Sequence, residues 1–183
     1  MSSIVIDISQ LTKRVTTVRK LLSPLRGGTV PCYLRPAPRQ YGECHILAAC
    51  QKQEIGISFE EWQFHTLVKD LWCQYYELWR PIGQTDKRFL ERIYLNILHL
   101  NYHHNFEKVV SIHCDPNEKG SEPQSSYKRG PHLHIQKSES PLNKCHFPLN
   151  YSHLKIVLSS IDNVTNAFND AIQILRHEVL SKY

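Results

Sequence analysis

The sequence predicts an α+β fold, with a helical N-terminal half followed by an antiparallel four-stranded meander that packs on a C-terminal helix. Apolar residues recur at helical spacing through much of residues 1–105. From residue 106 onward, short segments alternate apolar and polar residues, as half-buried strands do. A chain of 183 residues is long enough for one sizeable core, so we expect a single domain over residues 1–183.

Residues 1–105 are expected to be mainly helical. A short β-branched segment at residues 4–7 predicts a strand. Ser9 then caps a helix that should run to about Leu22, because Pro24 follows the last apolar residue of the helical pattern. The predicted helix lies within a basic segment over residues 8–42.

Two further helices are predicted at the end of the helical part. Ser58 and Glu61 form a capping box, and the wide apolar stripe that follows predicts a long helix over residues 58–79. A second helix over residues 85–100 should pack antiparallel to the first through the short connection between them.

Residues 106–183 are expected to form the antiparallel sheet and a closing helix. The closing helix should extend from about residue 160 to residue 181, with one apolar side. Four segments predict strands, at residues 107–115, 130–136, 145–149 and 153–159.

Histidines gather on one face of this predicted sheet. Side chains alternate between the two faces along a strand, and in each of the four segments the apolar residues share one parity. Because paired strands lie about 4.8 Å apart, side chains on the other face come within reach of one ligand. That face carries His113, Asp115, His132, His134, His146 and His153.

The first interpretation of this face is acid–base catalysis on a phosphodiester. His132 and His134 are the natural pair for removing and donating a proton, and His113 could replace or orient one of them. This interpretation predicts a hydrolase, a phosphodiesterase or ribonuclease-like protein acting on or binding RNA or a nucleotide. The residues expected to contact the substrate's phosphate are Lys128, Arg129 and Tyr127.

A basic segment over residues 8–42 suits the same substrate. It contains seven basic and no acidic residues, whereas the whole chain has a net charge of +5. Arg14, Arg19 and Lys20 are therefore expected to bind a nucleic-acid backbone. The alternative is an ordinary solvated helix face.

The second interpretation is a zinc site in a zinc-dependent hydrolase. Two histidines spaced i, i+2 on a strand can chelate one metal ion, so His132 and His134 would bind zinc with Asp115 and His146. The six residues 130–135, "GPHLHI", are similar to the second ligand motif of the LytM-type zinc endopeptidases, GPHLHF. The upstream HxGxD-like motif of that family has no match here, so peptidase activity is not expected. A looser likeness is to the histidine-rich "PHHxH" strand of TumE-type toxin proteins.

The third interpretation is a wet sheet face without catalysis, in a non-catalytic interaction subunit of a defence or toxin–antitoxin assembly. A protein partner would then contact the basic segment and the aromatic residues. No apolar run is long enough for a membrane span, and no signal peptide is recognisable, so we expect a cytoplasmic protein with no membrane contact. The six cysteines include no CxxC pair and should be reduced thiols, and Cys114 and Cys145 fall on the apolar face, which disfavours a cysteine nucleophile.

Overall fold

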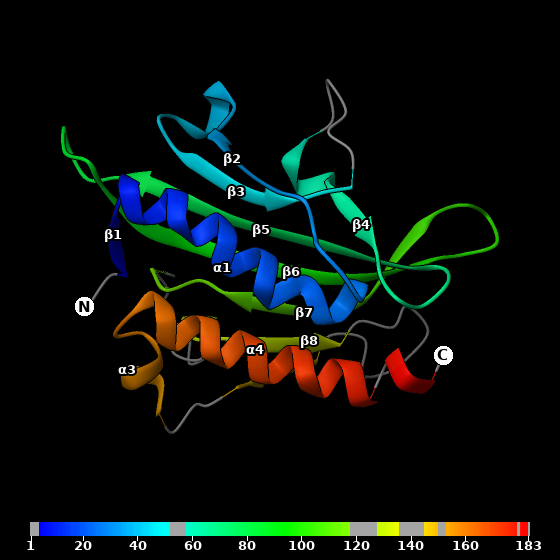
Figure 1. Cartoon of the computed structure of the whole chain (residues 1–183). Coiled ribbons are helices and arrows are strands. Elements are labelled where there is room, and N and C mark those ends of the chain that lie inside the picture. Colours follow the sequence, from blue (N-terminus) through cyan, green and yellow to red (C-terminus); the bar gives the residue numbers. More distant parts are fainter. Residues whose placement is uncertain are drawn as a thin grey trace.

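The structure is dominated by one large antiparallel sheet. This computed structural model describes residues 4–51, 58–117, 128–135, 145–149, 153–178 and 180–182. Within them, nine strands form the sheet, and two long helices lie side by side against one of its faces (Figure 1). The prediction of a helical N-terminal half followed by a four-stranded meander is therefore wrong.

The elements of the described residues have the following bounds. The helices are α1 (Ile8–Arg26), α3 (Leu154–Val157) and α4 (Ile161–Glu178), with single 3-10 turns η1 (Arg39–Tyr41), η2 (Phe59–Glu61) and η4 (Leu180–Lys182). The strands are β1 (Val5–Asp7), β2 (Cys32–Pro36), β3 (His45–Ala49), β4 (Gln63–His65), β5 (Leu71–Pro81), β6 (Lys87–Leu100), β7 (Phe106–Cys114), β8 (His132–Ile135) and β9 (Cys145–Pro148).

The strand order is β2-β3-β5-β6-β7-β8-β9, with β1 paired to β6 and β4 paired to β5. Residues from both predicted halves of the chain thus share one sheet, because β6 pairs with β7 across the expected boundary. None of the helices in the described part of the chain combines the length and apolar character needed to cross a membrane.

The first helix was predicted nearly correctly. Its start is fixed by the backbone N–H of Asp7, which donates to Gln10 Oε1 at 2.9 Å. The helix continues through Pro24 to Arg26, four residues beyond the predicted end. It ends at Gly27, whose φ of 72° is the left-handed conformation that glycine adopts without strain.

The two predicted helices at 58–79 and 85–100 are strands. Ser58 does cap a turn, but only η2 follows it, and Asp70 has a positive φ of 65° that no continuous helix tolerates. From Leu71 the chain is rich in aromatic residues, which favour strands. Because β5 and β6 are central strands covered on both faces, apolar residues occur at both parities, and this near-continuous pattern resembles a wide helical stripe.

The C-terminal part agrees better with expectation. The predicted strands at 107–115, 130–136 and 145–149 correspond to β7, β8 and β9, and the closing helix corresponds to α4. The fourth predicted strand, at 153–159, is wrong, because residues 154–157 form the helical turn α3.

Two hydrophobic clusters cover the two faces of the sheet. The larger one joins the apolar sides of α1 and α4 to one face of the central strands. The smaller one lies on the other face, where η1 and η2 cover the part of the sheet nearest β3. The smaller cluster consists of Cys44, Ile46, Ala48, Phe59, Tyr76 and Leu78, with Ala37, Tyr41, Trp62 and Tyr94 packed against it.

A buried ion pair connects the helices to the sheet. Arg14 on α1 contacts Glu77 on β5, with Nη2 2.7 Å from Oε1, and both side chains are almost completely buried. Arg14 Nη1 also donates to Thr165 Oγ1 on α4 at 2.9 Å. The carboxylate of Glu77 accepts further hydrogen bonds from Tyr75 Oη and from Trp79 Nε1. Burial lowers the pKa of Arg14, but the charges and hydrogen bonds of Glu77 and Tyr75 together outweigh it, so the pKa is raised overall and the guanidinium stays charged.

We expect Glu77→Gln to destabilise the fold strongly. The substitution leaves the guanidinium of Arg14 buried without its counter-charge, which costs about 3–5 kcal/mol in the free energy of unfolding. Urea denaturation measures this loss. The matched control is Arg80→Met, which breaks the partly exposed pair with Glu91 and should cost at most about 1 kcal/mol. Equal losses in the two variants would contradict the role assigned to the buried pair.

Candidate functional site

Two rows of side chains cross the sheet on the face away from α1 and α4. The strand register places the members of each row directly opposite one another on neighbouring strands. The first row is Tyr33, Ala48, Tyr76, Tyr94, His113 and His132. The second row is Gln74, Asn96, Ser111 and His134.

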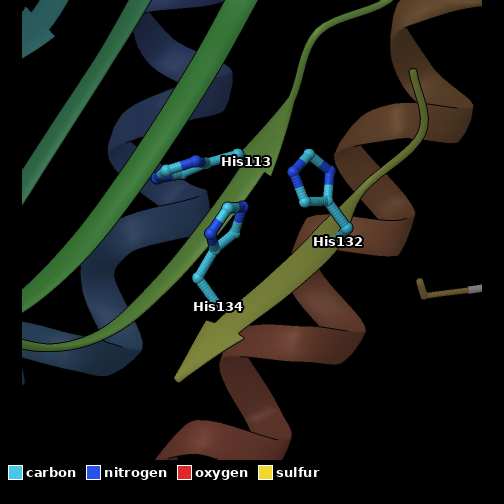
Figure 2. Close-up of side chains that lie close together, drawn as sticks. All are labelled: His113, His132 and His134. Atoms are coloured by element: carbon cyan, nitrogen blue, oxygen red, sulfur yellow. The ribbon is translucent and has the colours of Figure 1, made fainter. Parts of the chain in front are cut away.

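The parity rule predicted this face of β7 and β8 correctly. Val110, Ile112 and Cys114 belong to the large core under the helices. The alternate residue His113 therefore points to the other side of the sheet, together with His132 and His134. Figure 2 shows the three rings gathered over β7 and β8, with the helices on the far side of the strands.

The three histidines form one compact group. One ring nitrogen from each of His113, His132 and His134 lies within 4.8 Å of the others. The ring centroid of His113 is 4.3 Å from that of His134 and 5.8 Å from that of His132, and the last two rings are 4.7 Å apart. His132 is 1% exposed and His113 is 9% exposed, so the group is largely shielded from water.

In His113 and in His132, one ring nitrogen is hydrogen-bonded to an oxygen acceptor. His132 Nδ1 lies 2.9 Å from the carbonyl oxygen of Gly130, and His113 Nε2 lies 3.2 Å from Asn96 Oδ1. A carbonyl oxygen only accepts, so each of these nitrogens donates its N–H. In the neutral form of each ring, the lone pair is then on the remaining nitrogen, Nε2 of His132 and Nδ1 of His113.

Asn96 is itself held by a neighbour in the second row. Its Nδ2 donates to Gln74 Oε1 at 3.1 Å, which directs Oδ1 toward His113. The histidine group is thus oriented by a hydrogen-bond chain that starts on β5.

Tyr94 forms the wall of the group on the β6 side. Its ring centroid is 4.0 Å from that of His113, and it stacks on Tyr76 with centroids 5.2 Å apart. Burial raises the pKa of Tyr94 to about 12, with a further contribution from the charge of Asp115. The phenol is therefore protonated at neutral pH and donates to Asp115 Oδ1 at 3.3 Å.

Asp115, His146 and His153 were also predicted to lie on the histidine face. Asp115 follows β7 and accepts from Tyr94, and it is not a member of the histidine group. His146 pairs with His134 in the register of β9, but its side chain lies outside what the structure describes. His153 is exposed at the start of α3 and not on a strand, because the fourth predicted strand does not exist.

Of the predicted phosphate-binding residues, two lie at one end of the histidine group. The backbone carbonyl of Lys128 accepts from Asp115 N at 3.2 Å, and that of Arg129 accepts from Cys114 Sγ at 3.2 Å. Both residues therefore border the end of β7 near His113, and both are partly exposed. Tyr127 lies outside the described residues.

The basic residues of α1 do not share the histidine face. Arg14 is buried in the core by its ion pair with Glu77, so it is not available to an external anion. Arg19 and Lys20 are exposed, but they belong to the helix that covers the opposite face of the sheet. Arg19 also donates to the carbonyl oxygen of Cys32 at 3.2 Å. The histidines and the basic residues of α1 therefore lie on opposite sides of the sheet.

The five cysteines whose side chains the structure describes are buried free thiols. Burial raises the pKa of Cys32 to about 12 and that of Cys50 to about 11, and it raises the pKa of Cys114 well above its usual range. These thiols remain protonated at neutral pH, which argues against a cysteine nucleophile among them.

Sequence reasoning missed the residues that orient the histidines. Asn96 and Tyr94 were assigned to a helix, so their position beside His113 was not predicted. Gly130 was visible in the motif, and its role follows from two contacts. Its carbonyl binds His132, and a Cβ placed on it would lie 2.3 Å from Leu154 Cδ1.

We expect Gly130→Ala to destabilise the protein by about 1 kcal/mol, because the added methyl group overlaps only the end of the partly exposed Leu154 side chain, which can move aside. Urea denaturation measures the loss. Adding Leu154→Ala removes the overlap and should recover part of it, with Leu154→Ala alone as the control. If the loss of stability in the double variant equals the sum of the losses in the two single variants, the overlap between residue 130 and Leu154 is contradicted.

Comparisons with protein families, with curated proteins and with solved structures give no match for this chain. The chemistry that can be proposed for the histidine group therefore rests on its own residues.

Proposed function

We propose that this protein is a zinc-dependent hydrolase whose metal is bound by His113, His132 and His134. The observation that carries the proposal is the approach of three imidazole nitrogens to within 4.8 Å of one another. A group this compact suits a cation shared by all three rings.

The geometry of the group is close to that of a tetrahedral site. With Zn–N bonds of about 2.0–2.1 Å, the ligand nitrogens of such a site lie about 3.4 Å apart. The nitrogens of this group, which lie within 4.8 Å of one another, would therefore have to approach by up to about 1.4 Å to bind the ion. His113 Nε2 and His132 Nδ1 each contact an oxygen acceptor, so a metal held at the second nitrogen of these rings would have the outer hydrogen bonds that zinc-bound histidines commonly have.

Among the side chains that the structure describes, the group offers three ligands, which is the number found in catalytic zinc sites. Structural zinc sites have four protein ligands, whereas catalytic sites have three and keep the fourth position for water. Three neutral histidines leave the metal its full positive charge, which lowers the pKa of bound water to about 7 and supplies hydroxide as a nucleophile.

The proposed substrate is a phosphodiester of RNA or of a nucleotide. The backbones of Lys128 and Arg129 contact Asp115 and Cys114 at the end of β7 that carries His113, and these two residues are the proposed source of positive charge for the phosphate. The same three histidines without metal would have to act as a proton donor and acceptor in direct ring contact. A chelator distinguishes the two, because it inactivates only the metal-dependent enzyme.

We expect His132→Ala and His134→Ala to lose stoichiometric zinc and phosphodiesterase activity while the fold is retained. Metal content is measured by mass spectrometry after purification and dialysis against zinc. Activity is measured on bis(p-nitrophenyl) phosphate and on short RNA. His103→Ala, which changes an exposed histidine in the turn after β6, is the matched control. A wild-type protein that remains active in chelator would contradict the metal-dependent mechanism.

We expect Asn96→Ala to weaken zinc binding about 10- to 100-fold, because His113 loses the acceptor that orients it. Competition with a chromophoric chelator measures the affinity. Asn166→Ala, an exposed change on α4, should leave the affinity unchanged. Equal affinities in the two variants would show that Asn96 does not position His113.

A further inference from the structure

A second site lies on the same face of the sheet as the histidines, near its β2–β3 end. It is a cavity of about 250 Å³ lined by Arg35, Pro36, Ala37, Pro38, Ile46, Phe59 and Trp62. This volume is below the roughly 300–1,000 Å³ of sites for drug-sized ligands, so it suits one small ring system.

The lining combines flat apolar surfaces with one cation. Trp62 and Phe59 are aromatic, and the guanidinium carbon of Arg35 lies 5.8 Å from the centre of the Trp62 ring. Among the described residues, the cavity lining includes no acidic side chain. Arg39, in the adjacent η1, is exposed, whereas the nearby carboxylate of Glu60 lies 3.7 Å from Arg92. Arg35 is therefore the one charged side chain among the described residues that line the cavity.

Aromatic contacts connect the cavity with the histidine group. Phe59 packs edge-on against Tyr76, Tyr76 stacks on Tyr94, and Tyr94 contacts His113. The cavity lies over β2 and β3, whereas His113 is on β7. Three to four strand spacings separate them, which is about 14–19 Å along the sheet. A single strand of about four to six stacked nucleotides spans this length at 3.4 Å per nucleotide.

We propose that this cavity binds a nucleobase, stacked on Trp62 with its phosphate at Arg35, and that the base belongs to the RNA whose backbone reaches the histidines. Stacking on an aromatic ring beside an arginine is how proteins bind single-stranded bases without reading their sequence. The length of the RNA rests on the proposed hydrolase function, but binding of the base does not.

Base binding is tested by titrating the zinc-loaded protein with adenosine 5′-monophosphate and measuring the heat of binding by calorimetry. We expect Trp62→Ala to weaken binding about 5- to 150-fold. Arg35→Ala should also weaken it. The controls are Tyr102→Ala, an aromatic that is 87% exposed in the turn after β6, and Lys13→Ala, which removes the same charge from α1. Circular dichroism checks that each variant is folded. If Trp62→Ala is unfolded, the affinity of Arg35→Ala for the mononucleotide is the test of the proposed site.

Ribose 5-phosphate, which lacks the base, should bind far more weakly than the mononucleotide. Equal binding of the two, no binding of the mononucleotide at millimolar concentration, or equal losses in the pocket and control variants would overturn the proposal. His132→Ala should retain base binding. Retained base binding without any hydrolysis would refute the proposed enzyme and leave the base site intact.

The connection between the two sites is tested with RNA of two and of six nucleotides. We expect the wild-type protein to have a lower KM for the longer RNA and Trp62→Ala to lose this preference. Wild-type KM values that do not depend on length would separate the cavity from the hydrolytic site.

Discussion

The architecture depends on one buried interaction, the ion pair between Arg14 and Glu77. Burying two charges is costly unless they are paired and hydrogen-bonded, and Glu77 meets this condition with donors from Arg14, Tyr75 and Trp79. Because Arg14 also donates to Thr165, this single group joins α1, α4 and β5. A helix displaced from this position would leave a charge unpaired in the core, so both helices are held on one face of the sheet.

Holding both helices on one face leaves the other face to the histidines. The strand period of two then sets the face toward which the side chains of β7 point. Ile112 enters the core, so His113 points the opposite way. The same alternation explains why the basic residues of α1 cannot approach the histidines. In our proposal the substrate binds along the histidine face of the sheet, between Lys128 and Arg129 at one end and Arg35 at the other.

The sequence predicted the histidine group better than it predicted the fold. In β7 and β8 one face is apolar and the other polar, so parity alone brought His113, His132 and His134 together. In β5 and β6 both faces are covered, and residues such as Tyr76 and Leu78 are buried at the parity opposite to Tyr75 and Trp79. Alternation disappears in such strands, and an apolar run with a capping signal at Ser58 then resembles a helix. The predicted strand at 153–159 was wrong because residues 154–157 form a helical turn, and the parity of apolar residues cannot reveal such a turn.

The strand that sequence patterns describe least well, β5, contributes to both faces of the molecule. Glu77 fixes the helices on one side, and Gln74, on the other parity, orients Asn96 and through it His113. Tyr76, also on that side, contacts both Phe59 beside the cavity and Tyr94 beside the histidines. A shift of β5 by one residue would exchange its two faces, placing Glu77 among the histidines and Gln74 under the helices. A register shift of β5 that disrupts the histidine site would therefore also separate Glu77 from Arg14, which is unfavourable because it leaves Arg14 buried and unpaired.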